Sequence, residues 1–191
     1  MLLPEEKIIL LSPTTLECNG KIYDCRTGRG GIRTKKVEGD GATPIGSFPL
    51  RQVLYRPDRI RPFVCGLPMA SLTPVDGWCD DPTDPFYNRL IKIPYPANHE
   101  LLWRESHIYD ILIVVGYNDA PVVPPKGSAI FIHLMNEKGT PTAGCIALSR
   151  KDMIDLLSEL SPVSQLIVPA HLEGTVSPLL SISTPFQENR L

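Results

Sequence analysis

The chain has 191 residues, a formal net charge of −2 at pH 7, and 42% hydrophobic and 21% charged residues. That length suffices for one domain with its own hydrophobic core, and the small charge without a long basic run argues against a nucleic-acid partner. Twenty prolines are unusual. Because proline fits poorly into helix interiors and strand ladders, they predict a loop-rich, mainly β protein with one or two helices.

The predicted strands are short apolar segments bounded by turn residues. In chain order they are residues 7–12, 21–26, 47–55, 63–65, 89–93, 109–116, 128–133 and 164–168. The segment 109–116 is apolar enough for a fully buried central strand, and 128–133 is predicted to be its neighbour. Glycine-rich stretches at 27–33 and 38–46 separate the early strands, and they match no nucleotide-binding pattern.

One helix is predicted to begin after Ser149, because Ser149 and Asp152 have the spacing of a capping box. Residues 153, 154, 156, 157 and 160 then form one apolar face, and Ser161-Pro162 ends the helix. No domain boundary is visible. We expect one domain over residues 1–173 and a weakly patterned tail over 174–191, poorly ordered or lying on the surface.

The first seven residues contain neither a basic segment nor a long apolar one, so no export signal is recognised. No apolar stretch is long enough to cross a bilayer, and no membrane span is expected. The five cysteines show neither a C-x-x-C nor a zinc-site spacing. Cys18 with Cys25 and Cys65 with Cys79 could pair if geometry permitted, but most are expected to be buried free thiols.

The most informative segment is 130–149, which delivers His133 from the end of an apolar run and Cys145 from a Gly-Cys turn. A thiol is mostly protonated at neutral pH, and a neighbouring imidazole is the usual device that makes it nucleophilic. The pair therefore predicts a cysteine acyl-transfer enzyme. Gly144 permits an unusual backbone conformation, and the amides of Gly144 and Cys145 could form an oxyanion hole. The alternative is a structural cysteine and a core histidine.

The second nitrogen of His133 needs an acceptor, which could be a backbone carbonyl, Asn118 or Tyr117. The acidic segment 76–85 lacks the spacing of a calcium loop, so no metal is expected. A polar groove for an amino acid that carries both charges fits better. Its candidate residues are Trp78, Asp80, Asp81, Tyr87, Asn88 and Arg89. His99-Glu100 and Trp103-Arg104 could equally line this groove or pack.

Together these motifs resemble a known family. Ile132-His133 followed by Pro-Thr-Ala-Gly-Cys-Ile-Ala-Leu at 141–148 is similar to the His…Ser/Thr-His-Gly-Cys signature of L,D-transpeptidase catalytic domains, the YkuD-like fold. Residues 38–50 resemble that family's Thr-Pro-x-Gly-x-Phe segment. Residues 76–82, 87–89 and 116–119 are similar to a compact proteobacterial branch. The resemblance covers roughly residues 24–168.

The resemblance implies a β-sandwich with the catalytic cysteine in a groove, acting without a cofactor on peptidoglycan stem peptides. Cys145 would be the nucleophile, His133 the general base and acid, and Gly144 part of the oxyanion site. The residues expected to contact the donor and acceptor stems are Trp78, Asp81, Arg89, Tyr117 and Asn118. A monomer in the periplasm or cell envelope is expected from this substrate, although no signal peptide is visible.

Two departures concern the substrate. The family's histidine two residues before the cysteine is Ala143 here, and the small residue after the first histidine is Leu134. Both leave the donor bond open, so cross-links of the diaminopimelate-diaminopimelate type and of the L-Ala-diaminopimelate type remain alternatives. Hydrolysis by the same Cys-His site, as an L,D-carboxypeptidase or endopeptidase, is a second function. A non-catalytic wall-binding module is a third.

Overall fold

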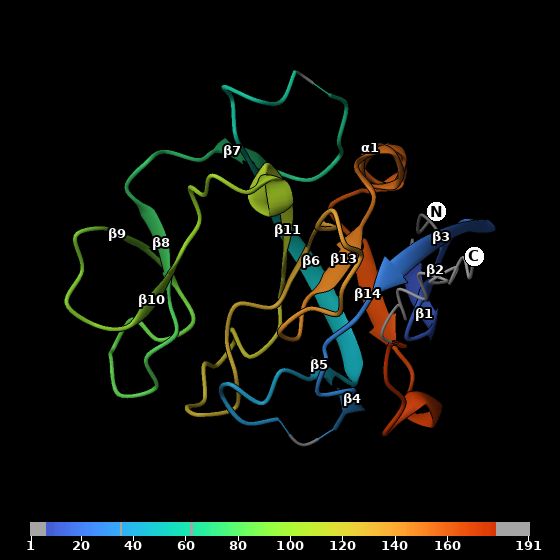
Figure 1. Cartoon of the computed structure of the whole chain (residues 1–191), viewed down its shortest axis with the longest axis horizontal. Helices are drawn as coiled ribbons and strands as arrows, with labels where there is room; N and C mark the ends of the chain where they lie inside the picture. The colour runs from blue at the N-terminus through green and yellow to red at the C-terminus, as the bar shows by residue number, and fades with distance from the viewer. Residues whose placement is uncertain (1–6, 35, 62, 179–191) are drawn as a thin grey trace, which may run out of the picture.

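Strands dominate the computed structural model, which describes residues 7–34, 36–61 and 63–178 (Figure 1). The prediction of a mainly β fold is confirmed. The strands are β1 (Lys7–Ser12), β2 (Thr15–Cys18), β3 (Lys21–Arg26), β4 (Ile32–Arg33), β5 (Thr43–Pro44), β6 (Gly46–Tyr55), β7 (Met69–Ser71), β8 (Asp76–Cys79), β9 (Leu90–Lys92), β10 (His99–Leu101), β11 (Ile111–Val115), β12 (Phe131–Leu134), β13 (Ile146–Leu148) and β14 (Gln165–Val168). The helical segments are η1 (His107–Tyr109), α1 (Arg150–Glu159) and η2 (Ala170–Leu172).

The main sheet closes on itself through its longest strand, β6. Its order is β11-β12-β13-β3-β2-β1-β14-β6-β7, and β6 pairs with β11 as well. Residues 46–49 of β6 pair with β14, whereas residues 50–55 pair with β11. Because the two halves of β6 pair with different strands, the sheet curls around a shared core, and few of its edges stay unpaired.

The centre of the core lies on β11, β12 and β13. Every residue of these three strands is buried, as expected for strands that are covered on both faces. The segment 128–133 was expected next to 109–116, and the pairing of β11 with β12 confirms this. His133 lies within β12 rather than at its end, and it faces Leu112 on one side and Ala147 on the other.

Helix α1 confirms the prediction from its cap. The Ser149 hydroxyl accepts a hydrogen bond from the Asp152 amide at 3.1 Å, which satisfies one of the amides that an N-terminus leaves free. Met153, Leu156 and Leu157 are buried against the core. Ile154 was expected on the same face, but its side chain is 38% exposed.

A smaller sheet, in the order β10-β8-β9, stands beside the main sheet (Figure 1). Strand β8 is buried throughout, although its segment was expected to form polar turns or a groove wall. The sequence did not predict this strand, because an aspartate is not expected at a buried strand position. Asp76 is tolerated there because its carboxylate pairs with Lys92 and accepts hydrogen bonds from Thr73. A buried acid with such partners no longer favours solvent.

The strand predicted at 63–65 is wrong. Val64 is 81% exposed, and Phe63 packs edge-on against Tyr55 with the ring centroids 5.7 Å apart. This segment therefore contributes a side chain to the core without joining a ladder. In the described part of the chain, neither Cys18 with Cys25 nor Cys65 with Cys79 forms a disulfide.

The described start of the expected tail is attached to the body of the protein. Ile32 exchanges backbone hydrogen bonds with Gly174 and Thr175, and the buried Ser177 hydroxyl bonds to Thr27. Residues 179–191 lie outside the described part of the chain. Among the described helices, none has the length and apolar character needed to traverse a lipid bilayer.

One buried carboxylate joins three segments around β11. Asp110, immediately before β11, is fully buried and accepts hydrogen bonds from Arg59 at 3.0 Å and from Arg150 of α1 at 2.8 Å. Its second oxygen also lies 2.8 Å from Nδ1 of His107. These contacts fix η1, whose Tyr109 packs against His133, relative to the helix and the sheet.

We predict that Asp110→Ala lowers the free energy of unfolding by about 1.5–3 kcal/mol, because it removes a buried carboxylate that accepts charge-assisted hydrogen bonds from Arg59 and Arg150. Urea denaturation followed by circular dichroism measures the change. Asp24→Ala is the control, since Asp24 pairs with Arg26 at the surface with its side chain 63% exposed, and it should cost less than about 1 kcal/mol. Equal stabilities of the two variants would show that Asp110 does not hold these segments together.

Candidate active site

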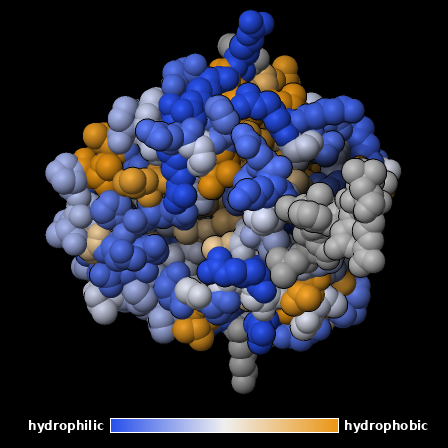
Figure 2. Space-filling model, viewed as in Figure 1, coloured by the Kyte–Doolittle hydropathy of each residue, from blue (hydrophilic) through white to orange (hydrophobic). Residues whose placement is uncertain are grey.

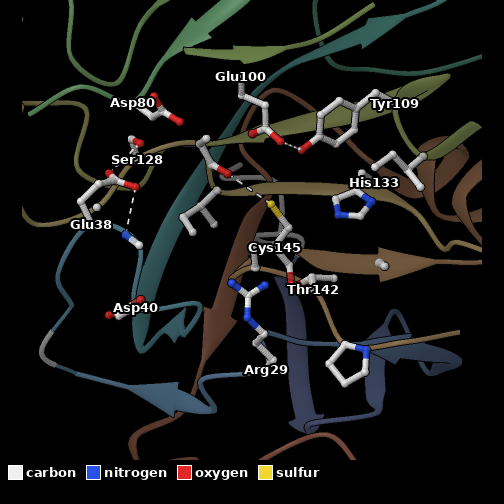
Figure 3. Close-up of a pocket in the computed structure, with 18 of the residues that line it drawn as sticks. Arg29, Glu38, Asp40, Asp80, Glu100, Tyr109, Ser128, His133, Thr142 and Cys145 are labelled. Atoms are coloured by element: carbon white, nitrogen blue, oxygen red, sulfur yellow. Dashed lines mark hydrogen bonds between the residues drawn. The ribbon is translucent and has the colours of Figure 1, made fainter. Parts of the chain in front are cut away.

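A cavity of about 510 Å³ opens on the face shown in Figure 2, which is hollowed near its centre. Cys145 and His133, the predicted nucleophile and base, both line it. They come from neighbouring parallel strands, because Cys145 directly precedes β13 and His133 lies in β12. The close-up in Figure 3 shows the imidazole beside the thiol. The fold therefore brings together two residues that are twelve positions apart.

The sulfur of Cys145 is held by two backbone groups of the segment that leads into β12. The thiol donates to the carbonyl of Ala129 at 3.2 Å and accepts from the amide of Phe131 at 3.3 Å. Burial raises the pKa of the Cys145 thiol to about 12, and the charge of Glu100 adds to the shift. In the resting site the thiol is consequently protonated and hydrogen-bonded to a carbonyl.

The imidazole of His133 is neutral and has one defined tautomer. Its Nδ1 lies 2.8 Å from the carbonyl oxygen of Leu134, which can only accept, so Nδ1 carries the proton and Nε2 keeps its lone pair. Burial lowers the pKa of His133 to about 4. The ring packs edge-on against Tyr109, with the centroids 5.3 Å apart. Nε2 is therefore free to accept a proton.

The turn that carries Cys145 is fixed by two threonine hydroxyls. The hydroxyl of Thr142 accepts from the Gly144 amide at 3.1 Å and donates to the Cys145 carbonyl at 2.6 Å, and Thr43 donates to the Gly144 carbonyl at 2.9 Å. Gly144 has φ of 131°, and a Cβ at this position would lie 2.8 Å from the carbonyl oxygen of Ala42. Only glycine fits here.

The cavity has an acidic wall. Glu100 of β10 accepts hydrogen bonds from the Tyr109 hydroxyl at 2.8 Å and from Arg104 at 2.7 Å. Burial raises the pKa of Glu100, and burial together with the charge of Glu38 raises that of Asp80. In Figure 3, Asp80 and Glu100 lie above the sulfur, Glu38 lies to its left and Arg29 lies below it.

The five residues predicted to contact substrate do not line this cavity: Trp78, Asp81, Arg89, Tyr117 and Asn118. Asp81 accepts from Thr83 within its own turn, and Arg89 is exposed elsewhere. The Tyr117 hydroxyl donates to the carbonyl of Lys126, and the Asn118 amide donates to the carbonyls of Val123 and Gly127. Of the acceptors considered for His133, the structure therefore selects a backbone carbonyl.

Trp78 instead belongs to a buried network behind the thiol. The Asn88 side-chain oxygen accepts from the Trp78 indole at 3.0 Å and from the Ala129 amide at 3.1 Å. The Asn88 amide group donates to the carbonyls of residues 117 and 118. Trp78 also packs edge-on against Phe131 at 5.1 Å. Through Asn88 and Trp78, the network contacts both residues whose backbone groups hold the sulfur.

Of the residues that line the cavity, Asp80, His99, Glu100 and Arg104 were named from the sequence as possible groove residues, but the charged Arg29, Lys36, Glu38 and Asp40 and the neutral Tyr109 were missed. The sequence feature that could have pointed to these residues is the pair of glycine-rich stretches at 27–33 and 38–46. A Cβ at Gly28 or Gly30 would lie 2.3 Å from a backbone oxygen of Gly41 or Asp40, so these glycines allow the two loops to pack backbone against backbone. Within the described residues, no group of three or more His, Cys, Asp or Glu side chains is placed to hold a metal ion.

Comparison with protein families gives one match. The model of the YkuD family, described as the L,D-transpeptidase catalytic domain, matches residues 11–168. This range contains every residue that lines the cavity. No curated protein and no solved structure matches the chain.

We expect Asn88→Ala to lower the free energy of unfolding by about 2–4 kcal/mol, because it leaves two buried N–H donors without an acceptor. Chemical denaturation measures this. Asn98→Ala is the matched control, because Asn98 is exposed and its amide donates to Asp80 at the protein surface. A loss in Asn88→Ala no larger than in the control would contradict the role given to the network.

The protonation states predict the pH dependence of thiol modification. Because the folded thiol pKa is raised, the thiolate fraction of Cys145 should increase about tenfold per pH unit from neutral pH upward. Peptide mapping after iodoacetamide treatment measures alkylation at Cys145 separately from the other cysteines. His133→Ala should keep this slope. A rate that is flat from pH 5 to 8 and drops in His133→Ala would instead reveal a resting thiolate–imidazolium pair.

Proposed function

We propose that this chain, which belongs to the YkuD family of L,D-transpeptidase catalytic domains, cross-links peptidoglycan stem peptides through a thioester on Cys145. The observation that carries the proposal is the placement of Cys145 and His133 in one cavity, with the imidazole proton fixed on Nδ1. This geometry supplies a nucleophile and a base whose free lone pair is on Nε2.

The first step begins with two neutral groups. Rotation about the Cα–Cβ bond of Cys145 takes the thiol away from the Ala129 carbonyl and toward His133. Nε2 of His133 removes the thiol proton as the sulfur attacks the acyl carbonyl of the donor stem. The imidazolium then protonates the leaving amine, the carbon–nitrogen bond breaks, and a thioester remains on Cys145. No net charge has to be stored in the buried site before substrate binds.

A backbone amide would stabilise the oxyanion of the tetrahedral intermediate. The Gly144 N–H already donates to the Thr142 hydroxyl. We therefore assign the oxyanion to the Cys145 N–H, in a turn that the hydroxyls of Thr142 and Thr43 hold rigid. A donor that is fixed before the reaction needs no reorganisation as charge develops.

In the second step an amine of the acceptor stem attacks the thioester, and the amide of the cross-link forms. Burial of the sulfur, with Cys145 only 6% exposed, supports transfer over hydrolysis because it limits access of water to the thioester. Both the diaminopimelate and the L-Ala donor bonds are compatible with this chemistry. We place the reaction in the cell envelope, where stem peptides are found, and propose that a monomer carries it out.

The Cys145→Ala variant should remain folded and lose all cross-linked product. Mass spectrometry of purified muropeptides after incubation measures this and identifies the donor bond from the fragment that is released. Dimers that require Cys145 support transpeptidation, whereas trimmed monomers that require Cys145 indicate a carboxypeptidase or endopeptidase. Product formation by Cys145→Ala at the wild-type rate would refute the thioester mechanism.

A further inference from the structure

Among the described residues, Arg29 is a cavity-lining cation without an ion-pair partner. Lys36 pairs with Asp40, and Arg104 pairs with Glu100. In the described part of the chain, the guanidinium of Arg29 has neither an ion pair nor a hydrogen bond, although it lines the same cavity as Cys145. Arginine in such a position is suited to bind a carboxylate through two parallel hydrogen bonds.

Arg29 is anchored to the turn that carries the nucleophile. Its backbone amide donates to the Thr142 carbonyl at 2.9 Å, three residues before Cys145. Its aliphatic stem lies against Gly41, where an added Cβ would meet the Arg29 Cγ at 3.2 Å. Figure 3 shows the guanidinium directed toward Cys145 from below, whereas Asp80 and Glu100 lie above the sulfur. The positive charge therefore stands beside the reacting sulfur and across from the acidic wall.

In the proposed reaction, the substrate carries a carboxylate that the positive charge of Arg29 can bind. The nitrogen that leaves from the donor, or attacks from the acceptor, belongs to a D-configured α-amino acid in each version of the chemistry. Terminal D-alanine has a free α-carboxylate, D-glutamate in the stem is linked through its γ-carboxyl, and the D-centre of diaminopimelate has its own carboxylate. In each case a carboxylate is attached to the carbon that bears the reacting nitrogen.

We infer that Arg29 binds the α-carboxylate of the D-amino acid whose nitrogen leaves or attacks at Cys145. This inference rests on the proposed function and adds a specificity-determining residue to it. Glu38 and Asp80 form no ion pair among the described residues, and they attract the ammonium form of the same amino acid from another part of the cavity wall. The cavity thus selects amines that carry a neighbouring carboxylate.

The first test needs no turnover. Iodoacetate and iodoacetamide alkylate the same thiol but differ in charge, so their rate ratio at Cys145 reports a nearby cation. At low salt, Arg29→Ala should lower the iodoacetate-to-iodoacetamide ratio about fivefold, as expected for loss of one unit charge close to the sulfur. Arg29→Lys should retain most of the ratio. Higher ionic strength should shrink the difference.

Arg61→Ala is the matched control, because Arg61 is exposed and lies outside the cavity. It removes the same charge from the molecule and should leave the ratio unchanged. An unchanged ratio in Arg29→Ala, or an equal fall in Arg61→Ala, would overturn the inference.

The second test uses the acylated enzyme. D-alanine and D-alaninamide, at equal concentration, compete as acceptors for the acyl group of a stem peptide, and mass spectrometry measures the two products. The preference for D-alanine should fall about tenfold in Arg29→Ala and be largely restored in Arg29→Lys. An unchanged preference would overturn the role of Arg29 while leaving transpeptidation intact. A lowered alkylation ratio without any acyl product would support the carboxylate site and reject the proposed function.

Discussion

The sulfur of Cys145 lies between a carbonyl that accepts a hydrogen bond from the thiol and an amide that donates one to the sulfur, both from the segment leading into β12. The position of that segment therefore decides where the nucleophile lies. Asn88 fixes Ala129 through its amide, and Trp78 supports both Asn88 and Phe131. Strand β12 then carries His133, two residues beyond Phe131. One short stretch of backbone thus positions both the nucleophile and its base.

Burial of both groups has a chemical consequence. It raises the thiol pKa and lowers the imidazole pKa, so each group is neutral at rest. In the proposed mechanism, the thiolate forms only after substrate binds, when the thiol proton moves to Nε2 of His133. This arrangement protects the thiol from adventitious oxidation or alkylation, because the thiolate is the reactive form. Arg29 and the acidic residues occupy different parts of the cavity wall. A zwitterionic group can therefore place its carboxylate near Arg29 and its ammonium near the acids.

Much of the fold follows from local signals in the sequence. The bounds of β1 and β3, the burial of β11 and the cap of α1 were predicted because alternation, apolar runs and Ser149 act within a few residues. Strand β8 was not, because Asp76 and Gly77 contradict the usual pattern and are accommodated only by tertiary partners.

The site divides in the same way. Cys145 and His133 were chosen as the candidate pair because their chemistry is rare and only one loop separates them in the sequence. Asp80, Glu100 and Arg104 were also named as possible groove residues, and they line the cavity. Arg29 and Glu38 were not, because they are more than a hundred residues from Cys145 and reach it only through the close packing of glycine loops. Trp78 and Asn88 were assigned to substrate, yet the indole N–H needs a buried acceptor and turns both side chains inward.

The thioester on Cys145 is tested most directly by intact-protein mass spectrometry of enzyme quenched during the first turnovers with a stem-peptide donor. The expected result is a mass increase equal to the acyl portion of the donor, located by peptide mapping on Cys145 and absent from Cys145→Ala. Cross-linked product that accumulates while the protein stays unmodified, or an adduct on another residue, would contradict it.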